Sequence, residues 1–294
     1  MSSTAQMIIF FVSIITVIVL FRKSKEQEPY LLIKLFGYMF LGAFLLDLNG
    51  LKLPLGFAIF LLFFRKKKMN ADTKYIAAYV GLAIFMLGIF VPQIERFVFE
   101  RTHHIELLDT NFFSGSLVKE LEHLRDELKV EGDPTELRGF DMTIQEDGTY
   151  ENLSIGLAEQ THEGTVNYTI ELSSDGKALD VSRYKVQEEE VFEDYRFTEA
   201  AFTFARLDLL SSNMLEFGDA NYFNLTTDGR RVAYEQTATN TYQINTAGKM
   251  KVVDNQLPVQ AIVVHACGGK ELNEFGNPLK CEQNEELLFD MLKK

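Results

Sequence analysis

Most of the fold of this chain can be inferred from residues 140–157, FDMTIQEDGTYENLSIGL. Polar and apolar residues alternate on both sides of Asp147-Gly148, and an Asp-Gly pair between two alternating runs is a strong signal for a β-hairpin. The pattern returns around Asp175-Gly176 and Asp228-Gly229. We therefore expect three hairpins: Phe140–Gln145 with Tyr150–Leu157, Thr165–Leu172 with Ala178–Val186, and Tyr222–Thr226 with Arg231–Gln236.

The remaining patterns of this region predict more strands and a few helices. A weaker turn at Ala247-Gly248 joins Thr241–Asn245 to Met250–Val253, and Val259–His265 is apolar enough to be a central strand. Apolar residues at helical spacing predict one helix over Thr198–Ser212 and a short terminal helix over Gln283–Leu292. The fold class is therefore α+β, with an antiparallel hairpin-rich sheet packed on one helix.

Charge divides the chain into two parts. Residues 1–92 carry 10 Lys/Arg against 4 Asp/Glu, a net charge of +6, whereas residues 93–294 carry 19 against 38, a net charge of −19. The acidic part repels phosphate backbones and anionic headgroups, so no nucleic acid is expected as a partner. The first 92 residues are mostly apolar, and the acidic part is long enough for one domain with its own core.

Four apolar stretches in residues 1–92 predict a transmembrane α-helical anchor of about four helices, with the lipid bilayer as its partner. They are Met7–Phe21, Tyr30–Leu48, Leu51–Phe64 and Tyr75–Val91. The third is short for a helix that must cross about 30 Å of hydrocarbon. An alternative is that the second and third stretches form a re-entrant pair, which would leave the orientation unchanged.

The basic clusters predict the direction of insertion. Arg22, Lys23 and Lys25 follow the first stretch and Arg65–Lys68 follows the third, and such clusters stay in the cytoplasm. This places the N-terminus and the C-terminal domain outside, in a multi-pass protein of the cell membrane. No positive charge precedes the first stretch, which argues against a cleaved signal peptide.

Residues 93–132 are expected to be a helical neck between the anchor and an extracytoplasmic domain, residues 133–294. Ile94, Phe97, Val98, Ile105 and Leu108 recur at helical spacing. A second helix carries one leucine stripe, which packs either on the domain or on a second copy of the chain; its members are Leu117, Leu121, Leu124 and Leu128. Two histidines, His103 and His104, stand side by side on the expected helix, so they cannot hold one metal ion together.

Cys267 and Cys281 are the two cysteines of the chain, and both fall in the part placed outside. In an oxidising compartment such a pair predicts a disulfide. Two free thiols or a metal site with His265 are the alternatives, although His265-Ala-Cys267 supplies too few ligands at an unsuitable spacing. No metal site and no cofactor is therefore expected.

No catalytic motif with a full set of partners is present. Ser116 and Lys119 match the S-x-x-K spacing of Ser/Lys hydrolases, but Ser116 also suits the N-cap of the neck helix. Asn152, Asn167 and Asn224 begin N-x-S/T sequons, and an acidic run over 188–194 lacks the alternating ligands of a calcium loop.

These features together predict a membrane protein that displays a domain to bind, sense or scaffold a cell-envelope partner, a protein in the membrane or envelope, without being an enzyme. The alternatives are an envelope hydrolase using Ser116 and Lys119, and a subunit of a larger membrane complex.

Overall fold

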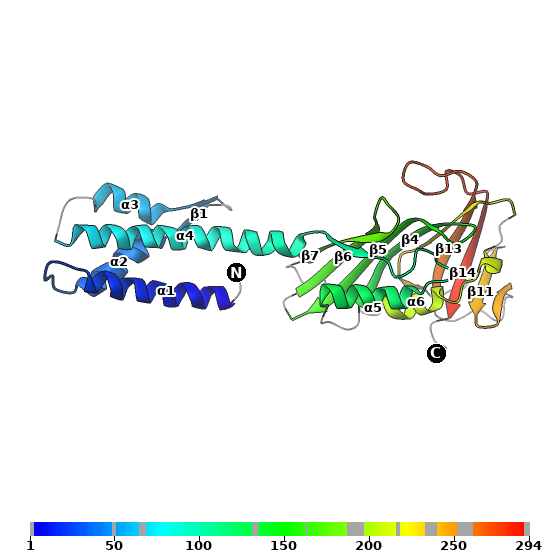
Figure 1. Ribbon diagram of the computed structural model, residues 1–294, viewed down its shortest axis with the longest axis horizontal. Helices are drawn as coiled ribbons and strands as arrows, with labels where there is room; N and C mark the ends of the chain where they lie inside the picture. The colour runs from blue at the N-terminus through cyan, green and yellow to red at the C-terminus, as the bar shows by residue number, and fades with distance from the viewer. Residues whose placement is uncertain are drawn as a thin grey trace. The chain divides into compact units, whose positions relative to one another are not determined.

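The computed structural model describes residues 3–48, 51–64, 69–130, 135–162, 164–186, 197–215, 218–232, 240–251 and 261–290. The chain forms two compact units, Met1–Phe99 and Glu100–Lys294. The first is helical and the second is built on a large sheet (Figure 1).

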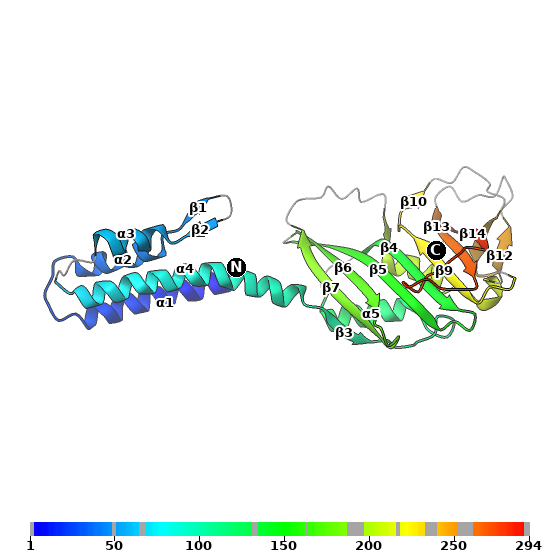
Figure 2. The same cartoon turned by 90° about the horizontal axis from the view of Figure 1, so that it is seen from above.

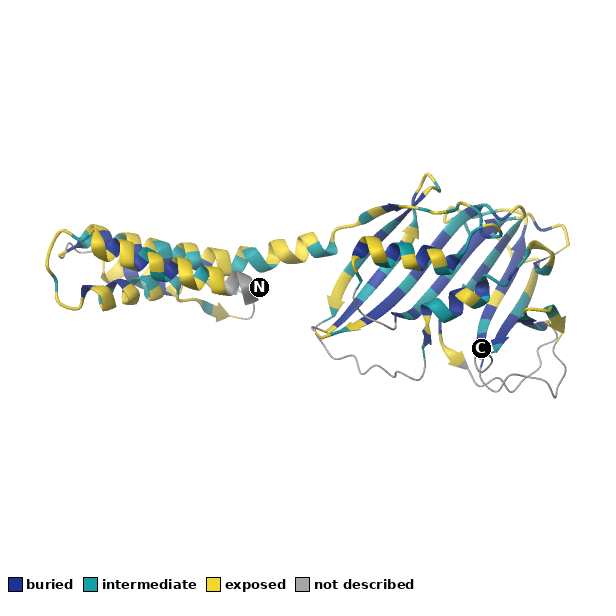
Figure 3. Cartoon of the chain, turned by 60° about the horizontal axis from the view of Figure 1, so that its bottom comes forward, coloured by how far each residue is buried: buried dark blue, intermediate teal, exposed yellow. Residues whose placement is uncertain are grey.

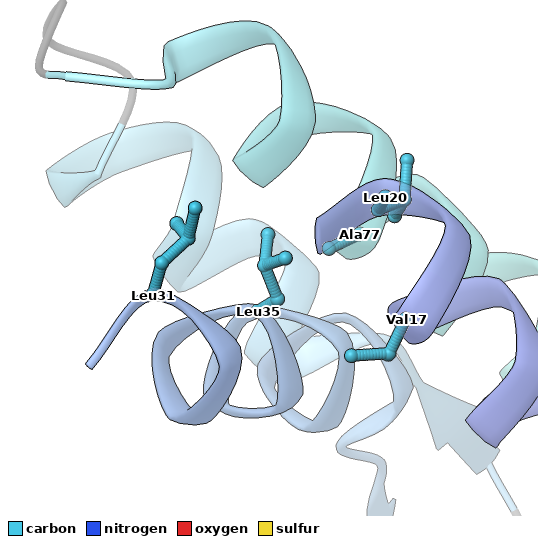
Figure 4. Packing of buried hydrophobic residues seen from close by; sticks show 5 residues of the cluster. All are labelled: Val17, Leu20, Leu31, Leu35 and Ala77. Atoms are coloured by element: carbon cyan, nitrogen blue, oxygen red, sulfur yellow. The ribbon is translucent and has the colours of Figure 1, made fainter. Parts of the chain in front are cut away.

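Apolar helices and one short hairpin make up the first unit. They are α1 (Ser3–Arg22), α2 (Leu31–Ala43), β1 (Leu46–Leu48), β2 (Leu51–Leu53), α3 (Leu55–Phe63) and α4 (Ala71–Glu100). The small core joins α1, α2 and α4 and consists of Val17, Leu20, Leu31, Leu35 and Ala77 (Figure 4). Glycines let α2 and α4 touch through their backbones, because a Cβ on Gly42 would lie 2.1 Å from the carbonyl oxygen of Ala78.

Helix lengths in this unit differ from the expected anchor. Within the described residues, α4 is the one helix long and apolar enough to cross a membrane. α2 has 13 residues and α3 has 9, so they rise about 20 Å and about 14 Å at 1.5 Å per residue. The third stretch starts as strand β2 and becomes helical only after Pro54, which has no N–H to donate. Four spanning helices are therefore not supported.

A partly buried polar network fixes the loop between α1 and α2 to the start of α4. Glu28 accepts hydrogen bonds from Lys74 Nζ at 2.7 Å and from Lys34 Nζ at 2.8 Å. Hydrogen bonds from Lys34 and Lys74 lower the pKa of Glu28 to about 2. Asn70 adds a second connection. Its Oδ1 accepts from the backbone N–H of Glu26, and its Nδ2 donates to the carbonyl oxygen of Glu26.

The second unit is a twelve-stranded sheet with helices on one face. Its main path runs β12-β11-β14-β13-β9-β4-β5-β6-β7-β3. In chain order the strands are β3 (His103–Glu106), β4 (Thr135–Gln145), β5 (Tyr150–Thr161), β6 (Gly164–Leu172), β7 (Ala178–Val186), β8 (Thr198–Glu199), β9 (Tyr222–Thr227), β10 (Arg231–Val232), β11 (Thr241–Asn245), β12 (Gly248–Lys251), β13 (Ala261–Gly269) and β14 (Gln283–Asp290). The α+β class with a large antiparallel-rich sheet is confirmed.

Three of the four hairpins expected from turn residues are present, and β5 also pairs with β6. β4 pairs with β5, β6 with β7, and β11 with β12, each antiparallel. The hairpin expected at Asp228-Gly229 is wrong, because β9 pairs with β4 on one side and β13 on the other. Gly229 instead turns the chain so that its carbonyl oxygen accepts from the N–H of Thr198, and β10 pairs with β13.

The C-terminal helix expected over Gln283–Leu292 is also wrong as far as the described residues extend. Strand β14 occupies Gln283–Asp290 and lies between β13 and β11. Leu287, Leu288 and Phe289 are consecutive and all buried, as in a strand covered on both faces. Pairing with two neighbouring strands outweighs the helical preference of the acidic and leucine residues here.

Two helices, rather than one, cover the sheet (Figure 3). α5 (Leu117–Leu128) buries its whole leucine stripe, which confirms that the stripe packs within the domain. α6 (Ala200–Leu207) is shorter than expected because Thr198 and Glu199 pair with β4 as β8, and Ser212–Met214 forms a separate 3-10 turn. Phe204 of α6 packs on Phe140 of β4 with ring centroids 5.9 Å apart.

Gly229 should tolerate a side chain much less well than Gly176. Both have positive φ, +73° and +67°, but a Cβ would meet the carbonyl oxygen of Leu137 at 2.2 Å in one case and nothing within 4 Å in the other. The left-handed conformation alone costs an L-residue about 1–2 kcal/mol. We expect Gly229→Ala to lower the melting temperature of the full-length protein in detergent at least twice as far as Gly176→Ala. Equal shifts would contradict the close contact.

Candidate binding face of the sheet

The face of the sheet turned away from α5 and α6 is polar. Successive strand residues point to opposite faces, so Phe140 and Met142 of β4 face the helices while Asp141 and Thr143 face the other way. The same alternation holds for Leu153 and Ser154 in β5 and for its neighbours. We call this side the polar face.

A continuous row of polar residues crosses the polar face. Each member lies directly opposite the next one on the neighbouring strand, at a strand spacing of about 4.8 Å. From β14 to β3 the row is Glu286, His265, Thr226, Asp141, Ser154, Glu171, Asp180 and His104. None of the eight is buried, although Thr143 and Leu288 on either side of the row are fully buried. The row is therefore the accessible centre of the polar face.

An amide cluster holds Asp141 in the middle of this row. Asp141 Oδ1 accepts from Asn224 Nδ2 at 3.2 Å and from Asn152 Nδ2 at 3.3 Å. Asn277 Oδ1 in turn accepts from Thr143 Oγ1 at 3.0 Å. Burial raises the pKa of Asp141, while the hydrogen bonds from Asn224 and Asn152 oppose that shift. No partner of Asp141 Oδ2 lies among the described residues, so this oxygen is available to a ligand.

Asn277 belongs to the loop that connects β13 to β14. The loop lies on the side of the sheet opposite α5 and α6, and Figure 2 shows it crossing in front of the strands. A disulfide between Cys267 and Cys281 closes it, with 5.5 Å between the Cα atoms. Phe275 and Leu279 stay 71% and 63% exposed on this loop. The disulfide therefore fastens both the amide cluster and an apolar edge to the polar face.

The two adjacent histidines lie in strand β3, not on a helix, because the helical pattern ends with α4 at Glu100. They face opposite sides of the sheet, and His104 ends the polar row. His104 Nδ1 lies 2.9 Å from Asp180 Oδ1, and this hydrogen bond raises the pKa of His104. Ile105, expected on the neck helix, is buried in the same strand.

Ser116 is the N-cap of α5. Its Oγ accepts from the backbone N–H of Lys119 at 3.4 Å and donates to Asp208 Oδ2 at 2.7 Å. Asp208 Oδ1 also accepts from the N–H of Leu117, so the serine and the aspartate share the helix terminus. These contacts match the capping role of Ser116.

Other residues considered in the sequence lie apart or outside the described part. The acidic run over 188–194 and the basic cluster Arg65–Lys68 fall outside the described residues. His265 is in the polar row, two positions before the disulfide-bonded Cys267. Within the described residues, no group of three or more His, Cys, Asp or Glu is placed to hold a metal ion.

A polar cleft of about 510 Å³ continues the polar face at the ends of β4 and β9. It is lined by Gln145, Glu146, Asp147, Asn221 and Tyr222. Gln145 and Tyr222 are register partners and lie two residues beyond Thr143 and Asn224. The cleft therefore extends the surface on which a ligand could lie.

The sequence singled out Asn152 and Asn224 as sequon residues, but it did not predict the amide cluster or the role of Asp141. One signal pointed to them: residues i and i+2 of a strand share a face, so each N-x-S/T sequon places two polar side chains together. Asn152 with Ser154 and Asn224 with Thr226 both lie on the polar face. The contribution of Asn277 from a distant loop leaves no comparable pattern.

The domain is thus an α+β unit with a helix-covered face and a polar face. The chain belongs to the protein family described as "Archaeal family", whose model matches residues 119–288. This match runs from α5 to β14 and includes every residue of the polar row except His104. No curated protein matches the chain. No solved structure matches it either.

Removing the disulfide should destabilise the domain. The bond joins residues 14 positions apart, and closing a loop of about 15 residues stabilises by about 3 kcal/mol in the chain-entropy model. We expect the Cys267→Ser/Cys281→Ser variant to lose about that much free energy of unfolding in a denaturant titration. If the stability difference between the variant and the native protein is no larger in oxidising buffer than in reducing buffer, the bond does not form in the native protein.

Ser116→Ala should act on stability alone. Loss of an N-cap hydroxyl costs about 1 kcal/mol, and we expect that loss in the free energy of unfolding, measured by denaturation. Ser174→Ala is the matched control, because Ser174 is exposed and lies in a turn. If both variants have the stability of the native protein, the capping role is wrong.

Proposed function

We propose that this chain is a multi-pass membrane protein that displays an acidic extracytoplasmic α+β domain, whose polar face binds a cell-envelope partner without catalysing a reaction. The observation that carries the proposal is the pairing, in one chain, of an apolar helical unit with a domain that presents an ordered polar row. Residues 1–92 are the anchor in this proposal.

The surface of the helical unit supports the anchor. Large apolar side chains on the outside of α1, α3 and α4 are strongly exposed, including Phe10 at 62%, Leu62 at 77% and Phe97 at 75%. An apolar surface of this extent is unfavourable in water and favourable against lipid chains. The helices touch one another through small residues, as membrane helices do.

Two of the four passes need the hairpin to reach across. α2 rises about 20 Å, and residues 44–48 add about 16 Å when extended, which together exceed the hydrocarbon thickness of about 30 Å. Asp47 and Lys52 are opposite each other in the hairpin, and charged residues of this kind suit the outer headgroup region. In this arrangement β1 extends α2 to the outer headgroup region, and residues 51–54 extend α3 to about 27 Å on the return arm.

The orientation rests on the basic clusters. Arg22, Lys23 and Lys25 follow α1, and Arg65–Lys68 follows α3. Keeping both clusters in the cytoplasm places the end of α4 and the domain outside. A disulfide in the domain fits an oxidising compartment.

A binding role fits the polar face better than hydrolysis at Ser116. The Ser116 hydroxyl and Asp208 are both engaged at the start of α5, on the helix-covered side of the sheet. Asp141, by contrast, is held by two amides and keeps one oxygen available on the polar face. This arrangement suits recognition by hydrogen bonds and charge.

The topology can be tested with the two native cysteines as labels. On intact cells, we expect a membrane-impermeant maleimide to modify the protein only after treatment with a reductant, because both thiols are outside and bonded to each other. In the Cys267→Ser/Cys281→Ser background, Lys52→Cys should be labelled without lysis if the hairpin reaches the outer surface. The readout is a gel shift.

Other labelling patterns would contradict or change the proposed topology. Modification of the native cysteines only after lysis would place the domain in the cytoplasm and overturn the proposal. If the domain is labelled on intact cells but Lys52→Cys is not, a re-entrant pair takes the place of the two hairpin passes. Ser174→Cys, in an exposed turn of the domain, is the positive control for access.

A further inference from the structure

We propose that the partner of the polar face is a cationic segment of another protein, lying extended across the strands along the polar row. This inference rests on the proposed function, because it names the chemistry of the ligand of the same face. It is carried by the sign of the charge on this face, by the geometry of the row and by the state of its central carboxylate.

Among Asp, Glu, Lys and Arg, the polar row carries acidic residues alone, while Lys270 of the disulfide loop is paired with Asp219 and Glu282. The row contains the carboxylates of Glu286, Asp141, Glu171 and Asp180 and no Lys or Arg. Arg138 lies at a bulge of β4 near one end of the face, and its charge is paired with Glu136 at 2.7 Å. The exposed side of α5 differs, since it mixes acidic with basic residues. General solvation would not require this separation, whereas recognition of a cation would.

The length of the row matches that of a short extended peptide. Eight residues on eight neighbouring strands are joined by seven intervals of about 4.8 Å, which gives a length of roughly 34 Å. An extended chain of about ten residues covers the same distance. The exposed members Glu171 and His265 lie on either side of the centre, so a segment on the row meets an exposed polar side chain in each half.

Asp141 provides a strong central contact. It is half-buried, and charges in such a setting attract each other more strongly than charges in bulk water. Its Oδ1 is satisfied by Asn152 and Asn224, which leaves Oδ2 for a lysine or arginine. The described residues offer no three-ligand group for a metal ion, which favours an organic cation over a metal.

The disulfide loop completes the surface beside the row. Asn277 bonds Thr143 and both cluster amides, and a Cβ on Gly276 would lie 3.4 Å from the Cβ of Asn152. Phe275 is the next residue and is 71% exposed. A cationic segment on the row therefore meets an apolar ring at this edge, which suits the alkyl stems of lysine and arginine.

The test measures binding of a fluorescent decalysine peptide to the purified full-length protein in a non-ionic detergent. We expect saturable binding that weakens as salt increases. Glu171→Gln/Asp180→Asn should raise the Kd at least fivefold, and Glu122→Gln/Glu127→Gln on the exposed side of α5 should change it less than twofold. Both variants alter the net charge by the same amount, so the comparison separates this face from overall acidity. Carbodiimide cross-linking should join the peptide to Glu171 or Asp180.

Four results would overturn the inference, and the first three concern the decalysine peptide. They are equal weakening by the two double variants, cross-links confined to α5, and no binding at millimolar peptide. An uncharged Gly-Ser peptide of equal length that binds as well would also overturn it. These outcomes are independent of the maleimide experiment, because the purified protein binds or fails to bind whichever way it was inserted in the cell.

Discussion

The alternation of side chains between the two sides of a strand is the constraint on which this domain depends. α5 and α6 cover one side with a leucine stripe and Phe204, so every strand must present its apolar residues there. The register fixed by this requirement also aligns the polar residues that alternate with the apolar ones along each strand. The polar row from Glu286 to His104 is therefore a consequence of how the core is built, and its order is as firmly set as the packing of the leucines.

The parts of the fold that sequence reasoning found are those specified by nearby residues. Asp147-Gly148 and Asp175-Gly176 close their own hairpins, and the stripe of α5 is complete within one helix. The failures in the sheet come from pairing with neighbouring strands, which a single segment does not reveal. β9 lies between β4 and β13, and β14 lies between β13, the preceding strand, and β11; this pairing overrode the turn at Gly229 and the helical composition after Gln283.

The candidate site was less predictable than the fold for the same reason. Its chemistry is divided among eight strands and a loop, and a single strand shows only pairs such as Asn152 with Ser154. The strand register decides which polar residues lie opposite each other on neighbouring strands, and the packing of the core fixes that register. Asn277 is more than 120 residues from Asn152, a partner it meets at 3.4 Å, and no periodicity connects them. The cysteines could be paired in advance only because the charge clusters had suggested an oxidising compartment.

The central position of β9 affects how the protein is made. β4 is complete at Gln145, but its neighbour β9 begins at Tyr222 and the outer neighbour β13 ends at Gly269. At a synthesis rate of about 5–20 residues per second, this gap of 124 residues takes roughly 6–25 s. During that interval the half-formed sheet has an unpaired inner edge, which is prone to aggregate. In the proposed arrangement the first helices would already be in a membrane during this interval, and this early anchoring would hold the unfinished domain apart from its copies.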